Sequence, residues 1–113
     1  MGMSGGLGKM LMKQMEEMQR KMERIQAALA EERIEASSGG AMVVATANGL
    51  GDLLELRIDP QVVDPEDVEM LQDLVVAAVS EALGRAQARR EERMAEVAGG
   101  LQLPGVGKLP GLF

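Results

Sequence analysis

The chain has 113 residues, enough for one folding unit with a core of its own. It contains neither cysteine nor histidine, which excludes disulfides, thiolate metal sites and imidazole catalysis; its one aromatic residue, Phe113, leaves the core to aliphatic side chains and ten methionines. The net charge of −6 opposes nucleic-acid binding unless lysine and arginine are concentrated on one surface.

Residues 1–7 are small and rich in glycine, and we expect a flexible N-terminus there. They lack the basic segment and apolar segment of a secretory signal. No run in the chain approaches the ~20 apolar residues that a membrane span requires. The sequence therefore predicts a cytoplasmic protein with no membrane partner.

Residues 8–32 contain no proline and, after Gly8, no glycine, and they are rich in strong helix formers, which predicts one long N-terminal helix. Apolar side chains recur along it at intervals of four and three, as in a heptad seam. A helix of about 37 Å is longer than a small domain can cover, so part of it should project or contact a partner chain. The seam consists of Leu11, Met15, Met18, Met22, Ile25 and Leu29.

Three short strands are predicted next, each bounded by turn residues. They cover residues 33–37, 41–47 and 54–58, and each carries alternating or β-branched side chains. The dipeptide Asn48-Gly49 is typical of a type I′ hairpin turn, in which both residues have positive φ. These features predict a three-stranded antiparallel sheet.

A second long helix is expected from Asp64 to about Val97, with Asp64 as its N-cap and Pro65 at its first position. Its apolar residues repeat at helical spacing and should lie across the sheet. Residues 99–113 are rich in glycine, leucine and proline and predict a flexible tail. Residues 8–98 then form a single α+β domain.

Both helices carry basic residues toward their free ends. Lys9, Lys13, Arg20 and Arg24 fall on one side of the first helix, and Arg85, Arg89, Arg90 and Arg93 follow the second. Glutamates are interspersed with them, so an ordinary solvated helix face with i,i+4 ion pairs is an open alternative. Acids cluster elsewhere, in residues 59–73, so a net-negative protein can still present positive helix ends.

No hydroxyl residue lies beside a base in a nucleophile motif. The sequence therefore predicts a protein that is not an enzyme, with no catalytic residue, cofactor, metal or small-molecule substrate. The near absence of aromatic side chains also disfavours recognition of single strands by base stacking.

A homodimer is expected on physical grounds. A three-stranded sheet under one helix buries little surface, and a heptad seam left in water is unfavourable. Pairing of two chains about a two-fold axis would cover both the sheet and the seam. It would leave the helix ends projecting as prongs. The sequence does not identify the surface that forms the dimer.

Several segments, taken in order, resemble the YbaB/EbfC family of bacterial nucleoid-associated proteins. They are residues 10–15, the Val43-Val44 strand closed by Asn48-Gly49, Ile58-Asp59-Pro60, residues 70–79 and the Gly/Leu/Pro-rich tail. The resemblance implies an α-β-β-β-α protomer, a tweezer-like homodimer and binding of duplex DNA with relaxed sequence preference. Family contacts with DNA are attributed to the helical prongs, which correspond here to the segments holding Lys9, Lys13, Arg20, Lys21, Arg24, Arg85, Arg89, Arg90 and Arg93.

Two functional hypotheses follow. The leading one is a nucleoid-associated homodimer that binds duplex DNA mainly through the phosphate backbone, with a role in nucleoid organisation and gene regulation. The alternative is an adaptor that holds partner helices with its Met-rich seam and does not bind DNA.

Overall fold

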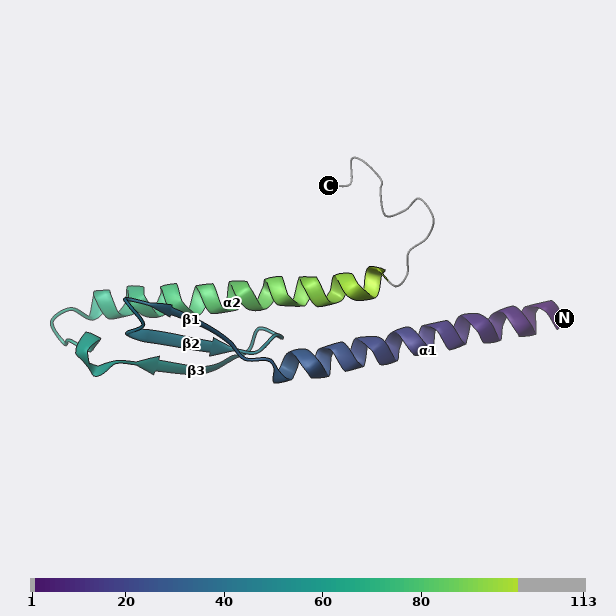
Figure 1. The fold of residues 1–113 in the computed structure, drawn as a ribbon, viewed down its shortest axis with the longest axis horizontal. Coiled ribbons are helices and arrows are strands. Elements are labelled where there is room, and N and C mark those ends of the chain that lie inside the picture. The colour runs from purple at the N-terminus through teal and green to yellow at the C-terminus, as the bar shows by residue number, and fades with distance from the viewer. Residues whose placement is uncertain (1, 100–113) are drawn as a thin grey trace, which may run out of the picture.

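The computed structural model describes residues 2–99, with side chains from residue 6 to residue 98. It is an elongated molecule measuring 77 × 32 × 16 Å, in which helix α2 lies along a small sheet and helix α1 extends from one end of it (Figure 1). The predicted α-β-β-β-α order is confirmed. The elements are α1 (Gly2–Glu31), β1 (Ile34–Ser38), β2 (Val43–Ala47), β3 (Leu53–Ile58), the 3-10 helix η1 (Pro60–Val62) and α2 (Val68–Gly99).

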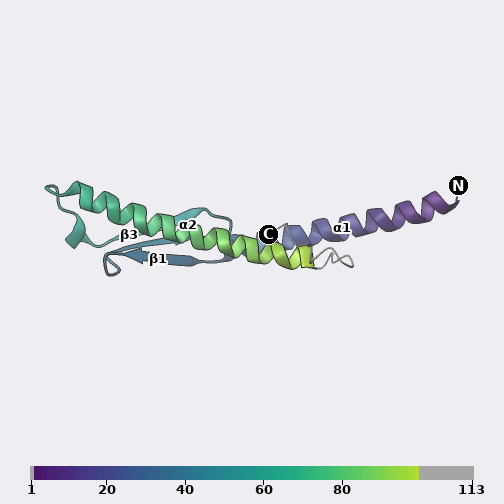
Figure 2. The ribbon, with the colours of Figure 1, turned by 90° about the horizontal axis from the view of Figure 1, so that it is seen from above.

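Helix α1 begins at Gly2, six residues before the predicted start, and its N-terminal half projects past the end of α2 (Figures 1 and 2). We call this projecting part, residues 2–20, the arm. The helix ends where Arg33 turns back and donates from Nη1 to the carbonyl oxygen of Ala30, at 3.2 Å. A cation at this position satisfies a terminal carbonyl and complements the negative end of the helix dipole.

The sheet has the order β1-β2-β3, and both pairs are antiparallel. Ala45 lies opposite Ala36 on β1 and Leu56 on β3, so these three side chains share one face. A register shift between Thr46 and Ala47 marks a bulge in the pairing with β3. Helix α2 contacts β1 and β2 and leaves β3 as an edge strand with less cover.

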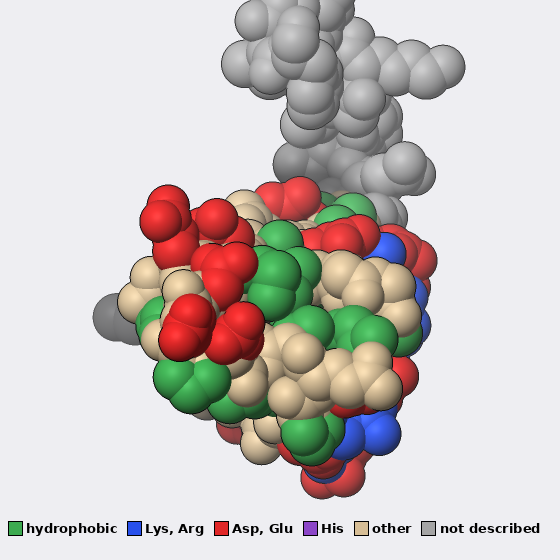
Figure 3. All heavy atoms as spheres, turned by 90° about the vertical axis from the view of Figure 1, so that its left-hand side faces the viewer, with side chains coloured by type: hydrophobic (Ala, Val, Ile, Leu, Met, Phe, Trp, Pro, Cys, Tyr) green, Lys and Arg blue, Asp and Glu red, His purple; other side chains and the backbone are tan. Residues whose placement is uncertain are grey.

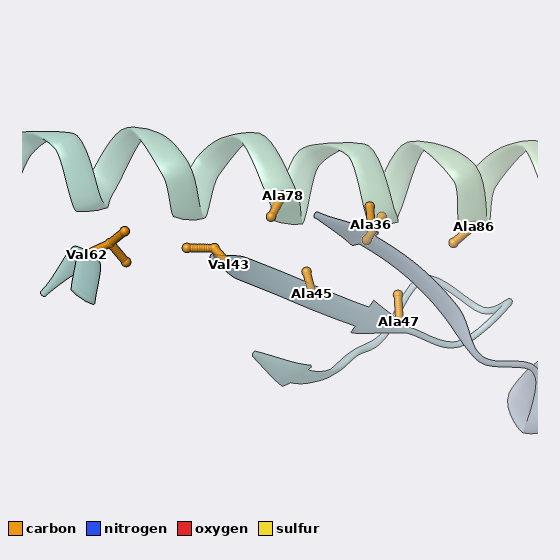
Figure 4. Close-up of a cluster of buried hydrophobic side chains, with 8 residues drawn as sticks. Ala36, Val43, Ala45, Ala47, Val62, Ala78 and Ala86 are labelled. Atoms are coloured by element: carbon orange, nitrogen blue, oxygen red, sulfur yellow. The ribbon is translucent and has the colours of Figure 1, made fainter. Parts of the chain in front are cut away.

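The core between α2 and the sheet is built largely of alanine (Figure 4). Ala78, Ala82 and Ala86 recur every four residues along α2, so they form one small-residue stripe on which the strands lie. Small side chains on both surfaces allow the helix axis to approach the sheet closely. The buried cluster consists of Ala36, Val43, Ala45, Ala47, Val62, Ala78, Ala82 and Ala86.

The turn between β2 and β3 differs from the predicted type I′ hairpin, because Gly49 does not have a positive φ. The side-chain oxygen of Asn48 instead accepts hydrogen bonds from the backbone N–H groups of Leu50 and Asp52, both at 3.0 Å. Gly51, with φ of 91°, supplies the left-handed residue. A local side-chain to backbone bond has therefore replaced the tighter turn.

The predicted N-cap of the second helix is wrong by three residues. Asp67 caps α2, because its Oδ1 accepts from the N–H of Met70 at 3.2 Å. Asp64 accepts from the N–H of Glu66 at 2.9 Å and closes a separate turn before the helix. Both aspartates suit an N-cap, and the sequence pattern alone favoured the first. The predicted tail, apart from Gly99, lies outside the described residues.

Candidate nucleic-acid interface

The predicted basic residues of α1 are exposed and form no ion pair with any described residue. Between residues 9 and 24 there are five cations against three acids. The α1 stripe therefore lies on a stretch of helix with a net charge of +2, and its distal part lies on the arm. These residues are Lys9, Lys13, Arg20, Lys21 and Arg24.

The guanidinium group of Arg85 on α2 already forms contacts within the protein. Its Nη2 lies 2.6 Å from Glu81 Oε1, and its Nη1 donates to the carbonyl oxygen of Glu35 on β1 at 2.8 Å. This guanidinium joins the helix to the sheet edge. One donor on each terminal nitrogen of Arg85 is thus engaged within the protein, and its role in binding DNA stays a prediction.

Arg89 ties α2 to the base of α1. Its Nε donates to both carboxylate oxygens of Glu32 at 3.0 and 3.1 Å, and its Nη1 lies 3.1 Å from Glu92. Hydrogen bonding and Coulomb attraction from Glu32, with a smaller contribution from Glu92, raise the pKa of Arg89 above its usual value despite partial desolvation. Because 57 residues separate the partners, helical spacing could not reveal this pair.

Gly49 forms the second contact at the base of α1. Its N–H donates to the carbonyl oxygen of Leu29 at 2.8 Å. A Cβ at this position would lie 2.7 Å from Leu29 Cδ2 and 2.9 Å from the Leu29 carbonyl oxygen. Glycine is thus required here for close approach of two backbones, and Leu29, the last residue of the predicted seam, is fully buried.

Arg90 lies against the turn between β2 and β3. A Cβ at Gly51 would be 2.5 Å from Arg90 Nη1, and this nitrogen is buried without a hydrogen-bond partner among the described residues. Arg90 therefore packs against a turn, which leaves this donor less accessible to DNA than the exposed cations of α1.

Arg93 is the one α2 arginine that the structure brings next to the α1 stripe. A groove of about 460 Å³ separates the two helices near the end of α2. The groove brings Lys21 and Arg24 of α1 close to Arg93 of α2. These residues are far apart in the sequence, so the sequence alone could not show that they lie together. The lining residues are Lys21, Arg24, Ile25, Ala28, Arg93, Glu96 and Val97.

The burial of the predicted apolar seam changes along α1. Leu29 is buried, and Ile25, Met22 and Met18 are half-buried. Leu11 and Met15 are exposed, at 52% and 70%. The seam is thus core at the base of the helix and open surface along the arm.

The end of the molecule opposite the arm is acidic (Figure 3). Carboxylates crowd the loop before α2 and its first turn, where the sequence has no lysine or arginine between residues 58 and 84. The two ends of the long axis therefore differ in charge. The exposed acids here include Asp64, Glu66, Asp67 and Glu69.

Two other kinds of site are not found in the part of the chain that the structure describes. No group of carboxylates there could hold a metal ion. None of its helices combines the length and hydropathy needed to cross a bilayer.

Several known proteins are similar to this chain over most of its length. Proteins named nucleoid-associated protein share 52% identity in Moorella thermoacetica (93% of this chain, 99% of that one), 50% in Syntrophobacter fumaroxidans (90% and 92%) and 49% in Acetivibrio thermocellus (96% and 92%). A crystal structure of an uncharacterized protein from Helicobacter pylori has the same fold, with a TM-score of 0.67 and 26% identity over 81% of this chain and 94% of that one.

The family model for the YbaB/EbfC DNA-binding family matches residues 3–101, which span both helices and the sheet. The match confirms the resemblance found in the sequence and agrees with the prediction of a protein that is not an enzyme. By fold, by identity to its relatives and by the family match, this chain belongs to the YbaB/EbfC DNA-binding family.

Proposed function

We propose that the protein is nucleoid-associated and binds duplex DNA as a homodimer, mainly through contacts between its helical arms and the phosphate backbone. The observation that carries the proposal is the stripe of unpaired cations on α1, which continues onto a projecting arm. The relatives' names and the family description agree with it. A role in nucleoid organisation and gene regulation follows from such binding.

The chemistry favours the backbone over the bases. Lysine and arginine that neutralise phosphates release condensed counterions, which supplies affinity without sequence information. The chain has one aromatic residue, so it offers no platform on which bases could stack. The acidic end should be repelled by the duplex, which would orient the arm toward it.

A dimer is supported by apolar surface along β3, the edge strand that α2 leaves with less cover. Leu53 and Leu54 on β3 are 45% and 46% exposed. An edge strand with apolar side chains is a ready pairing surface for a second copy. Pairing there would bring two arms onto one molecule and double the number of phosphate contacts.

The central test changes the charge of the arm. The triple variant Lys9→Gln, Lys13→Gln, Arg20→Gln should bind duplex DNA more weakly, and the slope of log affinity against log salt should fall by about 0.9 for each phosphate that the protein no longer neutralises. Fluorescence anisotropy at several salt concentrations measures both quantities. The matched control is Arg57→Gln, since Arg57 is an exposed cation on the sheet that pairs with Glu35 and Glu55.

Equal weakening by the control would mean that only net charge matters. Unchanged affinity and slope in the triple variant would contradict binding by the arm.

The exposed apolar side of the arm supports a second candidate function, an adaptor that holds a partner helix. Leu7, Met10, Leu11, Met12 and Met15 are all more than half exposed, and flexible methionine surfaces adapt to varied partners. If Met15→Glu abolishes capture of a defined partner while the unmodified protein fails to retain duplex DNA at low salt, the adaptor function replaces DNA binding.

A further inference from the structure

We propose that the groove between α1 and α2 is a binding site for one phosphate group, held jointly by Lys21, Arg24 and Arg93. It rests on the proposed function only in that duplex DNA is the expected source of the phosphate. The site would lie at the junction of the two helices, and not along the arm where the other cations are found.

Charge in the groove favours an anion. Three cations and one acid line it, and neither Lys21 nor Arg24 forms an ion pair with a described residue. The only compensating contact among the described residues is between Arg93 Nη1 and Glu96 Oε2, at 3.6 Å, longer than the 2.6 to 3.1 Å contacts made by Arg85 and Arg89. Of Arg85, Arg89 and Arg93, Arg93 therefore has the longest ion-pair contact.

A buried donor in the same side chain lacks an acceptor. Arg93 Nε is shielded from solvent and has no hydrogen-bond partner among the described residues. A buried N–H without an acceptor is costly, and an arginine can bind phosphate through two parallel N–H donors, one of them Nε. Once the Arg93 side chain turns Nε toward the groove, a phosphate oxygen would supply the missing acceptor.

The shape of the groove suits a phosphate attached to a larger molecule. Its apolar walls, Ile25, Ala28 and Val97, exclude part of the solvent and so strengthen charge interactions inside it. Its volume of about 460 Å³ exceeds that of a single phosphate group. Because both helices supply cations, a bound phosphate would also hold the base of α1 against α2.

Glu96 would then act as an internal competitor for Arg93. A phosphate entering the groove must displace this weak pair and approach a carboxylate, so removal of the carboxylate should favour binding. We expect Glu96→Gln to tighten phosphate binding about two- to fivefold. Glu91→Gln is the matched control, since Glu91 is an exposed glutamate on the same helix that does not line the groove.

The test follows the Arg93 Nε–H resonance of the full ¹⁵N-labelled chain by NMR during titration with inorganic pyrophosphate and, separately, with a short DNA duplex. We expect both ligands to shift this resonance, with tighter binding in Glu96→Gln and no tightening in Glu91→Gln. Arg24→Gln should weaken the response at Arg93. A response to pyrophosphate alone would keep the phosphate site and assign it to a small phosphate compound.

Two outcomes overturn the proposal. In one, the duplex binds and perturbs Lys9 and Lys13 while Arg93 Nε–H responds to neither ligand, which leaves the proposed function intact. In the other, neither ligand affects Arg93 and Glu96→Gln binds no more tightly than Glu91→Gln. Failure of the duplex to bind anywhere would instead contradict the proposed function.

Discussion

At the scale of single residues, two contacts hold the base of α1, and both depend on residues whose partners are distant in sequence. Gly49 lets the turn after β2 touch Leu29, and Arg89 reaches Glu32 across from α2. Neither residue contributes to the apolar core. Their effect is to fix where the long helix leaves the folded body.

Gly49→Ala should destabilise the fold by about 1–3 kcal/mol, since its Cβ would clash with the side chain and backbone of Leu29. The matched control is Gly84→Ala within α2, where a Cβ meets nothing within 4 Å. That change should stabilise the protein by about 0.5–1 kcal/mol. Urea denaturation of both variants measures the difference, and equal stabilities would contradict a steric role for Gly49.

Arg89 is expected to act as a positioning residue. Exchanging the partners, Glu32→Arg with Arg89→Glu, preserves the ion pair and the net charge but moves the positive charge to the base of α1. Melting temperature and DNA affinity should fall in each single variant and return in the double variant. If the double variant recovers stability but not binding, Arg89 itself contacts DNA.

The pH dependence of this pair has a definite sign. The pKa of Arg89 is raised by Glu32, so the stability it contributes is complete below the ordinary arginine pKa and is lost only as pH rises through the higher folded value. Titration of Arg89 should therefore leave the unfolding free energy unchanged between about pH 6 and about pH 9. A loss of stability in that range that disappears in Arg89→Gln would contradict this.

At the scale of elements, the close approach of α2 to the sheet depends on its alanine stripe. Ala82→Leu should cost about 1–3 kcal/mol by overpacking, because Ala82 is fully buried against the strands. Ala77→Leu, at an exposed position of the same helix, should be nearly neutral. Thermal unfolding measures the difference in stability between the two variants. Similar melting temperatures would show that the interface between α2 and the sheet can accommodate a larger side chain.

Much of the element order could be predicted because helix and strand periodicities are local. The heptad spacing from Leu11 to Leu29 identified α1, and the alternation around Leu56 identified β3. The cap at Asp67 was missed because Pro65, a residue typical of the first helical position, favours Asp64 as the cap. The engagement of Arg89 and the grouping of Arg93 with Lys21 depend on tertiary contacts, which no sequence period encodes.

At the scale of the whole molecule, positive charge on the arm and negative charge at the opposite end make the long axis electrically polar. Two copies joined through their β3 sides would act on one duplex together. Leu54→Lys should therefore convert the proposed dimer to a monomer and weaken DNA binding. Light scattering coupled to size exclusion measures the mass, with Val63→Lys, an exposed apolar position outside the sheet, as control.

An unchanged mass for Leu54→Lys, or the same fall in mass for the control, would exclude β3 as the dimer surface.

Helix α1 is held only toward its base, so a small rotation there moves its free tip a long way. Thirty residues of helix extend about 45 Å, and a tilt of about 10° at its base would move the free tip by roughly 8 Å. That displacement is more than two steps along a duplex, whose bases are spaced by about 3.4 Å. Small movements at the contacts that Gly49 and Arg89 make with the base of α1 would thus change the position of its tip. The tip could then follow phosphates at varying spacing, as on bent or overwound DNA.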